Sequence, residues 1–144
     1  MSPAEINLVQ TSFRRILPVA DKTAALFFAR LFEIDPELRQ QVTGDIAAQG
    51  RKLMQSLALA VNGLSHPATL TPVVRRAGMR RPDALLGNGR LEAIGAALLW
   101  ALEKSAGQPF SIETHNAWMR AYWFLAEALR AGAREAVTRN PLAA

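Results

Sequence analysis

The residues best suited to chemistry lie in one stretch between positions 73 and 82. This stretch carries four arginines, one methionine and no histidine, and helical spacing places Arg76 and Arg80 on one face. Guanidinium groups stay protonated and form paired hydrogen bonds with carboxylates and phosphates. The stretch therefore predicts an anion or partner patch, with an ordinary solvated helix face as the alternative. The patch consists of Arg75, Arg76, Arg80 and Arg81.

Few other residues could support catalysis or metal binding. The absence of cysteine excludes disulfides, thiolate metal sites and cysteine nucleophiles. His66 and His115 are the two histidines, and they are too few for a dedicated histidine-based metal site. Neither accompanies a nucleophile-elbow motif, so we do not expect an enzyme. Met79 is the one soft metal ligand in the arginine-rich stretch, although a methionine on a helix usually fills a core.

Length and composition indicate one globular domain. The chain has 144 residues, half of them hydrophobic, which is enough to bury a core of its own. No charged leader precedes an apolar run, and Arg30 and Asp35 interrupt the longest apolar stretch before it could cross a bilayer. We therefore expect a cytoplasmic protein with no membrane partner.

The charge of the chain is basic, with a net value of +5. A basic chain can bind nucleic acid, an acidic protein or anionic lipid. Here the basic residues are mostly arginines dispersed over several predicted helices, and aromatic residues do not interleave with them as a single-strand binding platform requires. The charge therefore favours an arginine-rich solvated surface over specific nucleic-acid binding.

Periodic apolar residues predict helices along the whole chain. Ser2, Pro3 and Glu5 form a capping box with proline at the first helical position. Gly50 lies on an apolar helix face, where it would let another helix approach closely. Gly87-Asn88-Gly89 is typical of turns and predicts a loop from 82 to 89. The predicted helices cover about 3–17, 22–34, 45–64, 71–81, 90–106 and 111–138, with a short helical turn near 36–38.

No segment has the alternating pattern of a strand. The sequence therefore predicts an all-α single domain of six to eight helices. We expect residues 1–139 to form the domain and residues 140–144 to be a frayed C-terminal tail.

The order of long and short helices resembles the globin fold, in which helices pack crosswise around a pocket. Residues 26–38 resemble the second helix and following corner of neuroglobin-like and bacterial single-domain globins. Residues 49–54 resemble the part of their fifth helix that passes over the haem. Residues 95–103 and 117–122 resemble their seventh and eighth helices. The resemblance implies a globin fold over nearly the whole chain.

The resemblance also implies which residues would line a globin pocket. Phe28 would line its distal side. Gln49 would take the position at which many bacterial globins keep a glutamine for bound O2, and Leu53 would press on the same space. The pocket residues implied in this way are Phe28, Val42, Gln49, Leu53, Met79, Arg81 and Leu98. Trp100, Tyr122 and Trp123 are large enough to fill part of this space.

Two positions depart from the globin pattern. The family has a phenylalanine that stacks on the porphyrin just after the short third helix, and this sequence has Val42 there. The family's proximal histidine should lie 14 residues before Gly95, where this sequence has Arg81. Arginine is a poor iron ligand because its guanidinium stays protonated and offers no lone pair. Pro82 further predicts that the helix stops at this point.

With these departures, the resemblance predicts a globin-like protein that has lost histidine-ligated haem and O2 binding. It would be a binding or regulatory module, acting through a remodelled pocket for an apolar small ligand or through an arginine-mediated protein contact. No cofactor is expected, and the usual covalent bilin attachment needs a cysteine that the chain lacks. The alternative is a haem-binding globin ligated through Met79 that handles O2 or NO, since thioether ligation occurs in cytochromes. A nucleic-acid-binding helical module is a weaker alternative, and a homodimer is a further expectation for globin-like helices.

Overall fold

The chain is mainly helical over the part that the structure describes. The structure is a computed structural model, and it describes residues 1–86 and 89–139. These residues form eight α-helices, one short 3-10 helix and no strand, so the predicted all-α fold of six to eight helices is confirmed. The elements are α1 (Pro3–Ile16), η1 (Leu17–Val19), α2 (Ala20–Ile34), α3 (Leu38–Gln41), α4 (Ile46–Gly63), α5 (Pro67–Met79), α6 (Pro82–Leu86), α7 (Arg90–Ser105) and α8 (Ile112–Arg139).

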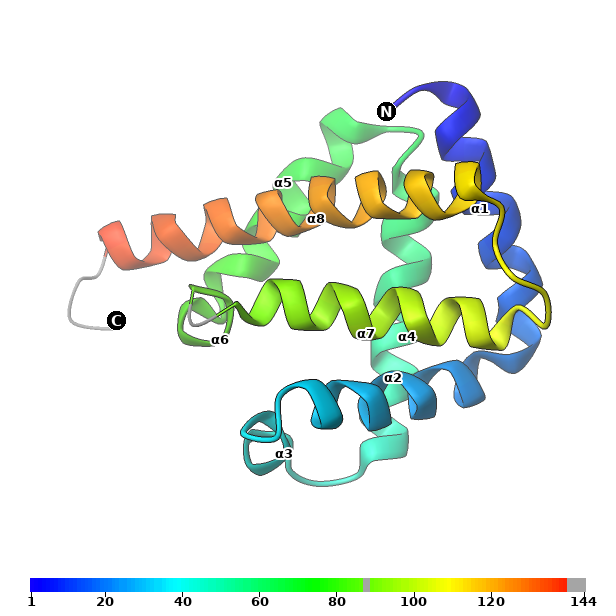
Figure 1. Cartoon of the computed structure of the whole chain (residues 1–144). Coiled ribbons are helices and arrows are strands. Elements are labelled where there is room, and N and C mark those ends of the chain that lie inside the picture. Colours follow the sequence, from blue (N-terminus) through cyan, green and yellow to red (C-terminus); the bar gives the residue numbers. More distant parts are fainter. Residues whose placement is uncertain (87–88, 140–144) are drawn as a thin grey trace.

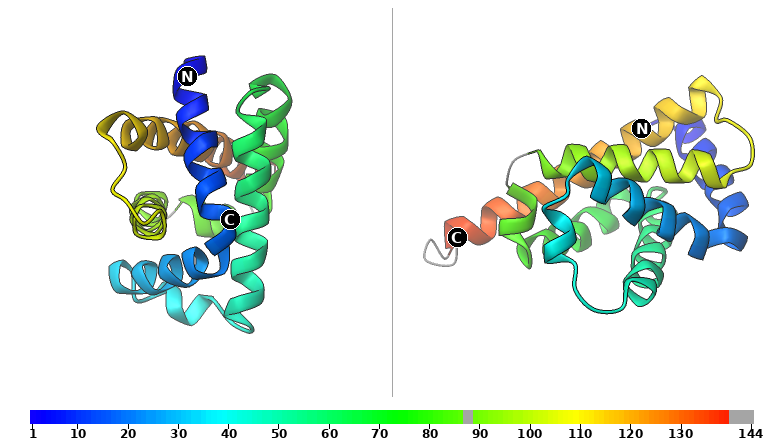
Figure 2. Two further views of the ribbon diagram at one scale, coloured as in Figure 1. Left: turned by 90° about the vertical axis from the view of Figure 1, so that its right-hand side faces the viewer. Right: turned by 60° about the horizontal axis from the view of Figure 1, so that its bottom comes forward.

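The helices pack crosswise rather than as a parallel bundle. Figure 1 shows α7 and α8 running side by side, while α4 passes behind them at a steep angle. Figure 2 keeps this crossed arrangement in both further views. α2 packs against α4 and α7, and α1 and α5 both pack against α8. Crossed pairs of this kind are the packing mode of globin helices.

The first helix begins as the sequence predicts. The backbone N–H of Glu5 donates to Ser2 Oγ over 3.1 Å, and the N–H of Ser2 donates to the Glu5 carboxylate over 2.9 Å. This capping box satisfies backbone groups that the first helical turn leaves unpaired. Pro18 ends the helix, and the chain turns through η1 into α2.

The segment that carries the arginines differs from expectation at its start. α5 begins at Pro67 rather than near Thr71, and it runs through Pro72. A proline inside a helix removes the hydrogen bond to the carbonyl four residues earlier, here that of Ala68. Ala68 is exposed, so water can take the place of the missing donor.

The predicted loop from 82 to 89 is wrong in its first part, because Pro82–Leu86 forms α6. A proline at the first position of a helix has no helical hydrogen bond to lose, so Pro82 can begin a helix as well as end one. Gly89 has a φ of +70°, which fits the expected turn. Gly87 and Asn88 lie outside the described residues, as does the expected tail at 140–144.

The first and last helices meet at a buried tryptophan. Trp118 on α8 is 2% exposed. Its indole Nε1–H donates to Ser12 Oγ over 2.8 Å, and its ring centroid lies 6.2 Å from that of Phe13. A buried indole needs such a hydrogen-bond partner, so Ser12 lets α1 accept the largest side chain of the core.

Two helix crossings depend on glycine. A Cβ at Gly50 on α4 would lie 2.8 Å from the Cβ of Ala24 on α2, which confirms the predicted close approach. The crossing of α5 and α8 is closer still. A Cβ at Gly78 would lie 2.0 Å from the carbonyl oxygen of Leu129, and one at Gly132 would lie 1.8 Å from that of Arg75. The backbones of α5 and α8 therefore touch with no side chain between them.

No helix of the described part of the chain is long and apolar enough to span a membrane.

The α5–α8 contact predicts a large effect of one methyl group. Gly132→Ala should lower the free energy of unfolding by about 2 kcal/mol or more, because the new Cβ meets rigid backbone of α5. Gly63→Ala is the matched control, since its Cβ would meet only the flexible end of Leu70, 2.9 Å away. Urea unfolding followed by circular dichroism measures both variants. Equal stability of the two would contradict the crossing.

Candidate functional site

The expected pocket residues divide between the core and the surface. Phe28 and Leu98 are buried in the main hydrophobic cluster, and Val42 and Leu53 are half-buried against it. The Phe28 ring lies 5.2 Å from the ring of Phe27 and 5.9 Å from that of Phe32. These four residues of the predicted site thus belong to or border one apolar cluster.

Gln49 is half-buried in the first turn of α4 and is tied to the preceding loop. Its side-chain Nε2 donates to the backbone carbonyl of Thr43. The same loop ends at Asp45, whose carboxylate accepts hydrogen bonds from the N–H groups of Ala47 and Ala48 over 3.0 Å and 3.3 Å. The glutamine amide therefore holds the connection between α3 and α4 in this structure.

Met79 and Arg81, at and just beyond the end of α5, differ in their exposure to solvent. α5 ends at Met79, and the N–H groups of Arg80 and Arg81 each donate over 3.3 Å to carbonyls of the last turn. The predicted helix stop before Pro82 is confirmed. Met79 is half-buried, whereas Arg80 and Arg81 are exposed. The charged group at the expected proximal position thus lies at the surface, where water solvates it.

The two histidines lie away from the end of α5. His66 is the N-cap residue of α5, at the opposite end of that helix from Met79. His115 is in the first turns of α8, and its Nδ1 lies 2.6 Å from Glu103 Oε1. Among the side chains that the structure describes, no three of His, Asp or Glu come together as a metal site.

The arginine patch is partly engaged with α8. Arg75 Nε lies 3.2 Å from the carboxylate of Glu135, which also pairs with Arg139 over 2.7 Å. Arg76, Arg80 and Arg81 are exposed and make no ion pair with the side chains that the structure describes. The partial negative charge at a helix C-terminus also favours cations here, which accounts for part of the cluster.

A cleft of about 360 Å³ opens between α7 and α8, and the sequence did not predict it. Trp100, Tyr122 and Trp123, which we expected to help fill a globin pocket, line this cleft. Its residues recur at helical spacing on one face of each helix. This pattern could predict a shared cleft only if the two helices were already known to be neighbours. The lining residues are Glu92, Gly95, Ala96, Leu99, Trp100 and Glu103 from α7, and His115, Met119, Tyr122 and Trp123 from α8.

Tyr122 closes the inner side of this cleft. Its hydroxyl donates to the backbone carbonyl of Leu91. Its ring rests on Gly95, where a Cβ would lie 2.5 Å from the ring. Burial, and then the nearby Glu92 carboxylate, raise the pKa of Tyr122 well above its ordinary value. A buried hydroxyl beside a carboxylate is therefore held in its protonated form.

Curated relatives resemble the chain over nearly its whole length, whereas no protein-family model matches it. A flavohemoprotein of Xylella fastidiosa (strain 9a5c) is 26% identical over 142 residues, which cover 96% of this chain and 35% of that protein. A flavohemoprotein of Vibrio cholerae is 24% identical over 130 residues, which cover 88% of this chain and 33% of that protein. The chain spans about a third of the length of the curated relatives it matches.

The chain has a globin fold. The crossed all-α arrangement and the close approach of α2 and α4 at Gly50 agree with the resemblance seen in the sequence. The likeness to flavohemoproteins covers the same helices, from α1 to α8. The names of those relatives denote haem proteins.

Tyr122 makes the stability of this globin fold sensitive to alkali. The pKa of Tyr122 is higher in the folded protein than in the unfolded chain. The stability that protonated Tyr122 contributes is therefore fully present below the unfolded pKa of about 10, and it falls as the pH rises above that value. Relative to Tyr122→Phe, the wild type should lose about 1 kcal/mol of stability between about pH 9 and about pH 11.

Denaturant unfolding at both pH values measures this difference. Because Tyr122 is the one tyrosine of the chain, the absorbance of tyrosinate reports its titration directly. An ordinary tyrosine titration in the folded protein would contradict the buried environment.

Proposed function

We propose that this chain is a globin-fold binding or regulatory module that has lost histidine-ligated haem and binds no haem in another way. The positions of Arg81 and of the two histidines carry this proposal. His66 lies about 20 Å from Met79 along α5, at 1.5 Å of rise per residue. His115 lies a similar distance, about 20 Å along α8, from Leu129, which meets the end of α5.

The side chains at the end of α5 do not fit a histidine-bound haem. Arg81 occupies the position implied for the iron ligand, is exposed, and follows the end of the helix. Its guanidinium has no lone pair to offer to a metal. Val42, at the position implied for the stacking phenylalanine, has no aromatic ring. These two observations from separate parts of the chain support the loss of the cofactor.

The exposed arginines support an anionic partner for the module. Arg76, Arg80 and Arg81 present guanidinium groups at one end of α5, next to Arg75 on the α8 side. Such groups form paired hydrogen bonds with carboxylates, so an acidic protein surface is the partner that we favour. The module would then recognise a protein at the place where the resemblance implies a cofactor.

Haem reconstitution tests the main proposal. We expect no stoichiometric Soret band when the purified protein is mixed with haem, together with a helical circular dichroism spectrum that shows an intact fold. A stoichiometric band in the wild-type protein would overturn the proposal.

The second candidate function is haem binding through Met79. Met79 is half-buried at the end of α5 and carries a thioether that can ligate iron. If a stoichiometric Soret band forms, it should disappear in Met79→Ala and persist in Met119→Ala, a control on α8 that removes an exposed methionine. A band that survives in both variants would exclude ligation by Met79.

The arginine patch predicts charge-dependent binding of an acidic chain. Replacing Arg76, Arg80 and Arg81 together by glutamine should weaken binding of poly-glutamate about tenfold, because the bidentate contacts are lost. Arg14, Arg15 and Arg51, replaced together by glutamine, are the matched control, since they are exposed residues of α1 and α4 with the same total charge. Equal losses in both triple variants would mean that net charge, not the patch, attracts the ligand.

A further inference from the structure

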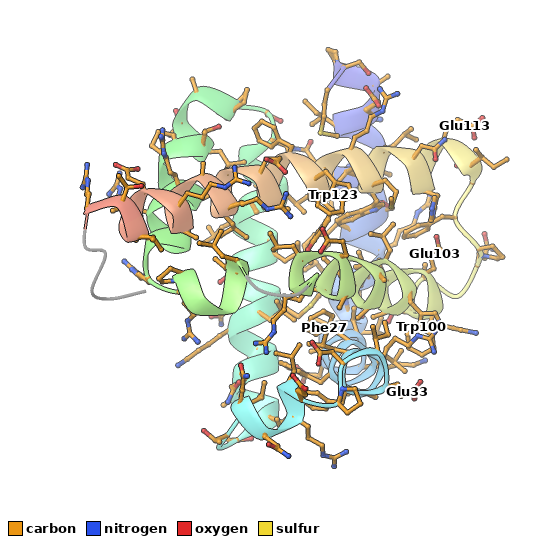
Figure 3. The ribbon with its side chains drawn as sticks, turned by 60° about the vertical axis from the view of Figure 1, so that its left-hand side comes forward. Phe27, Glu33, Trp100, Glu103, Glu113 and Trp123 are labelled. Atoms are coloured by element: carbon orange, nitrogen blue, oxygen red, sulfur yellow. The ribbon has the colours of Figure 1, made fainter. Side chains whose placement is uncertain are left out.

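The cleft between α7 and α8 is a second candidate binding site, separate from the arginine patch. α7 supplies one wall and α8 the other, and the Tyr122 ring, resting on Gly95, closes the inner side. Figure 3 shows Trp123 on α8 and Glu103 on α7 bordering the space between the two helices, with Trp100 lower on α7 toward α2. Glu33 and Glu113 in the same view point away from it.

The walls of the cleft are mainly aromatic. Tyr122 and Trp123 form an edge-to-face pair with ring centroids 5.4 Å apart, and Trp100 is half-buried on the opposite helix. The chain already places its own cations over these rings. Arg30 and Lys104 lie 5.2 Å and 5.8 Å from the Trp100 ring centroid, and Arg130 lies 5.9 Å from that of Trp123. Both indole rings therefore attract positive charge in this fold.

The titratable groups that line the cleft are Glu92, Glu103, His115 and Tyr122. No lysine or arginine is among the lining residues, although Arg30, Lys104 and Arg130 lie over the two indole rings. The carboxylate of Glu103 accepts a hydrogen bond from His115, and the carboxylate of Glu92 lies 3.4 Å from Arg130 Nη2. Glu92 is itself a lining residue, so its carboxylate borders the cleft. Aromatic faces together with carboxylates favour a cation with an apolar body over an anion or a neutral polar molecule.

We propose that the α7–α8 cleft binds a small organic cation, an ammonium group carried on an apolar body, between Trp100 and Trp123 with Glu92 and Glu103 facing it. The aromatic rings contact the alkyl groups around the nitrogen, and the two carboxylates balance its charge. Tyr122 does not contribute its hydroxyl, which is already bonded to Leu91. This site is independent of the proposed function of α5, so either can fail without the other.

Two probe ligands separate the effect of charge from the effect of shape. They are choline and 3,3-dimethylbutan-1-ol, which has the same shape but a carbon in place of the quaternary nitrogen. We expect choline to bind about tenfold more tightly than its neutral analogue. The three indole N–H signals in NMR titrations measure the binding. Those of Trp100 and Trp123 should shift, while that of Trp118, buried and bonded to Ser12, should stay in place.

Two variants with matched charge test the role of the cleft carboxylate. Glu103→Gln should weaken choline binding about fivefold, since it keeps the shape and removes one charge. Glu113→Gln makes the same change on α8, outside the cleft lining, and should leave binding unchanged. Circular dichroism confirms the fold of each.

A third variant should strengthen binding. Arg130 competes with the ligand because it lies over Trp123 and reaches Glu92. Arg130→Met should therefore tighten choline binding about threefold, a gain that partial unfolding cannot produce. Equal affinity for choline and its neutral analogue, equal effects of Glu103→Gln and Glu113→Gln, or absence of any shift at Trp100 and Trp123 would each overturn the proposal.

Discussion

The backbone contact between α5 and α8 at Gly78 and Gly132 is the constraint on which the rest of this globin fold depends. With no side chain between the two helices, the position of α5 is fixed by α8. The contact is made by backbone atoms, so it does not depend on the side chains that follow the last turn of α5. The end of α5 can therefore carry exposed arginines where the resemblance implies a metal ligand, and the fold can tolerate Val42 on the other side of the expected pocket.

The two faces of α8 have different neighbours and different chemistry. Toward α1, Trp118 is buried and bonded to Ser12. Toward α7, α8 borders the α7–α8 cleft, which is lined by Tyr122, Trp123 and the small residue Gly95. One long helix thus serves both as the main support of the core and as one wall of an aromatic cleft. The proposed cation site and the arginine patch use opposite charges on separate surfaces.

Local features of the sequence predicted the local features of the structure. The capping box at Ser2 and Glu5, the stop before Pro82 and the close approach at Gly50 each depend on a few neighbouring residues or on a single small one. The start of α5 and the helix at Pro82 were missed because proline can either interrupt a helix or begin one. Which of the two occurs depends on whether water can reach the backbone carbonyl that loses its donor. The α7–α8 cleft was missed because it joins residues that are near only after the helices pack. The seven implied pocket residues remain a prediction from the resemblance, since the structure brings only some of them into one cluster.

The length of α8 has a consequence for how the molecule opens. Its first half is held by α1 and α7, but Figure 1 shows its last turns extending beyond them, where α5 and α6 are the neighbours. Protection of amide hydrogens against exchange should therefore divide α8 at about Leu129, the residue that contacts Gly78. The turns beyond it should exchange together with α5, because the two helices hold one another through this backbone contact. A partner that bound the arginines of α5 would slow that exchange in α8 as well.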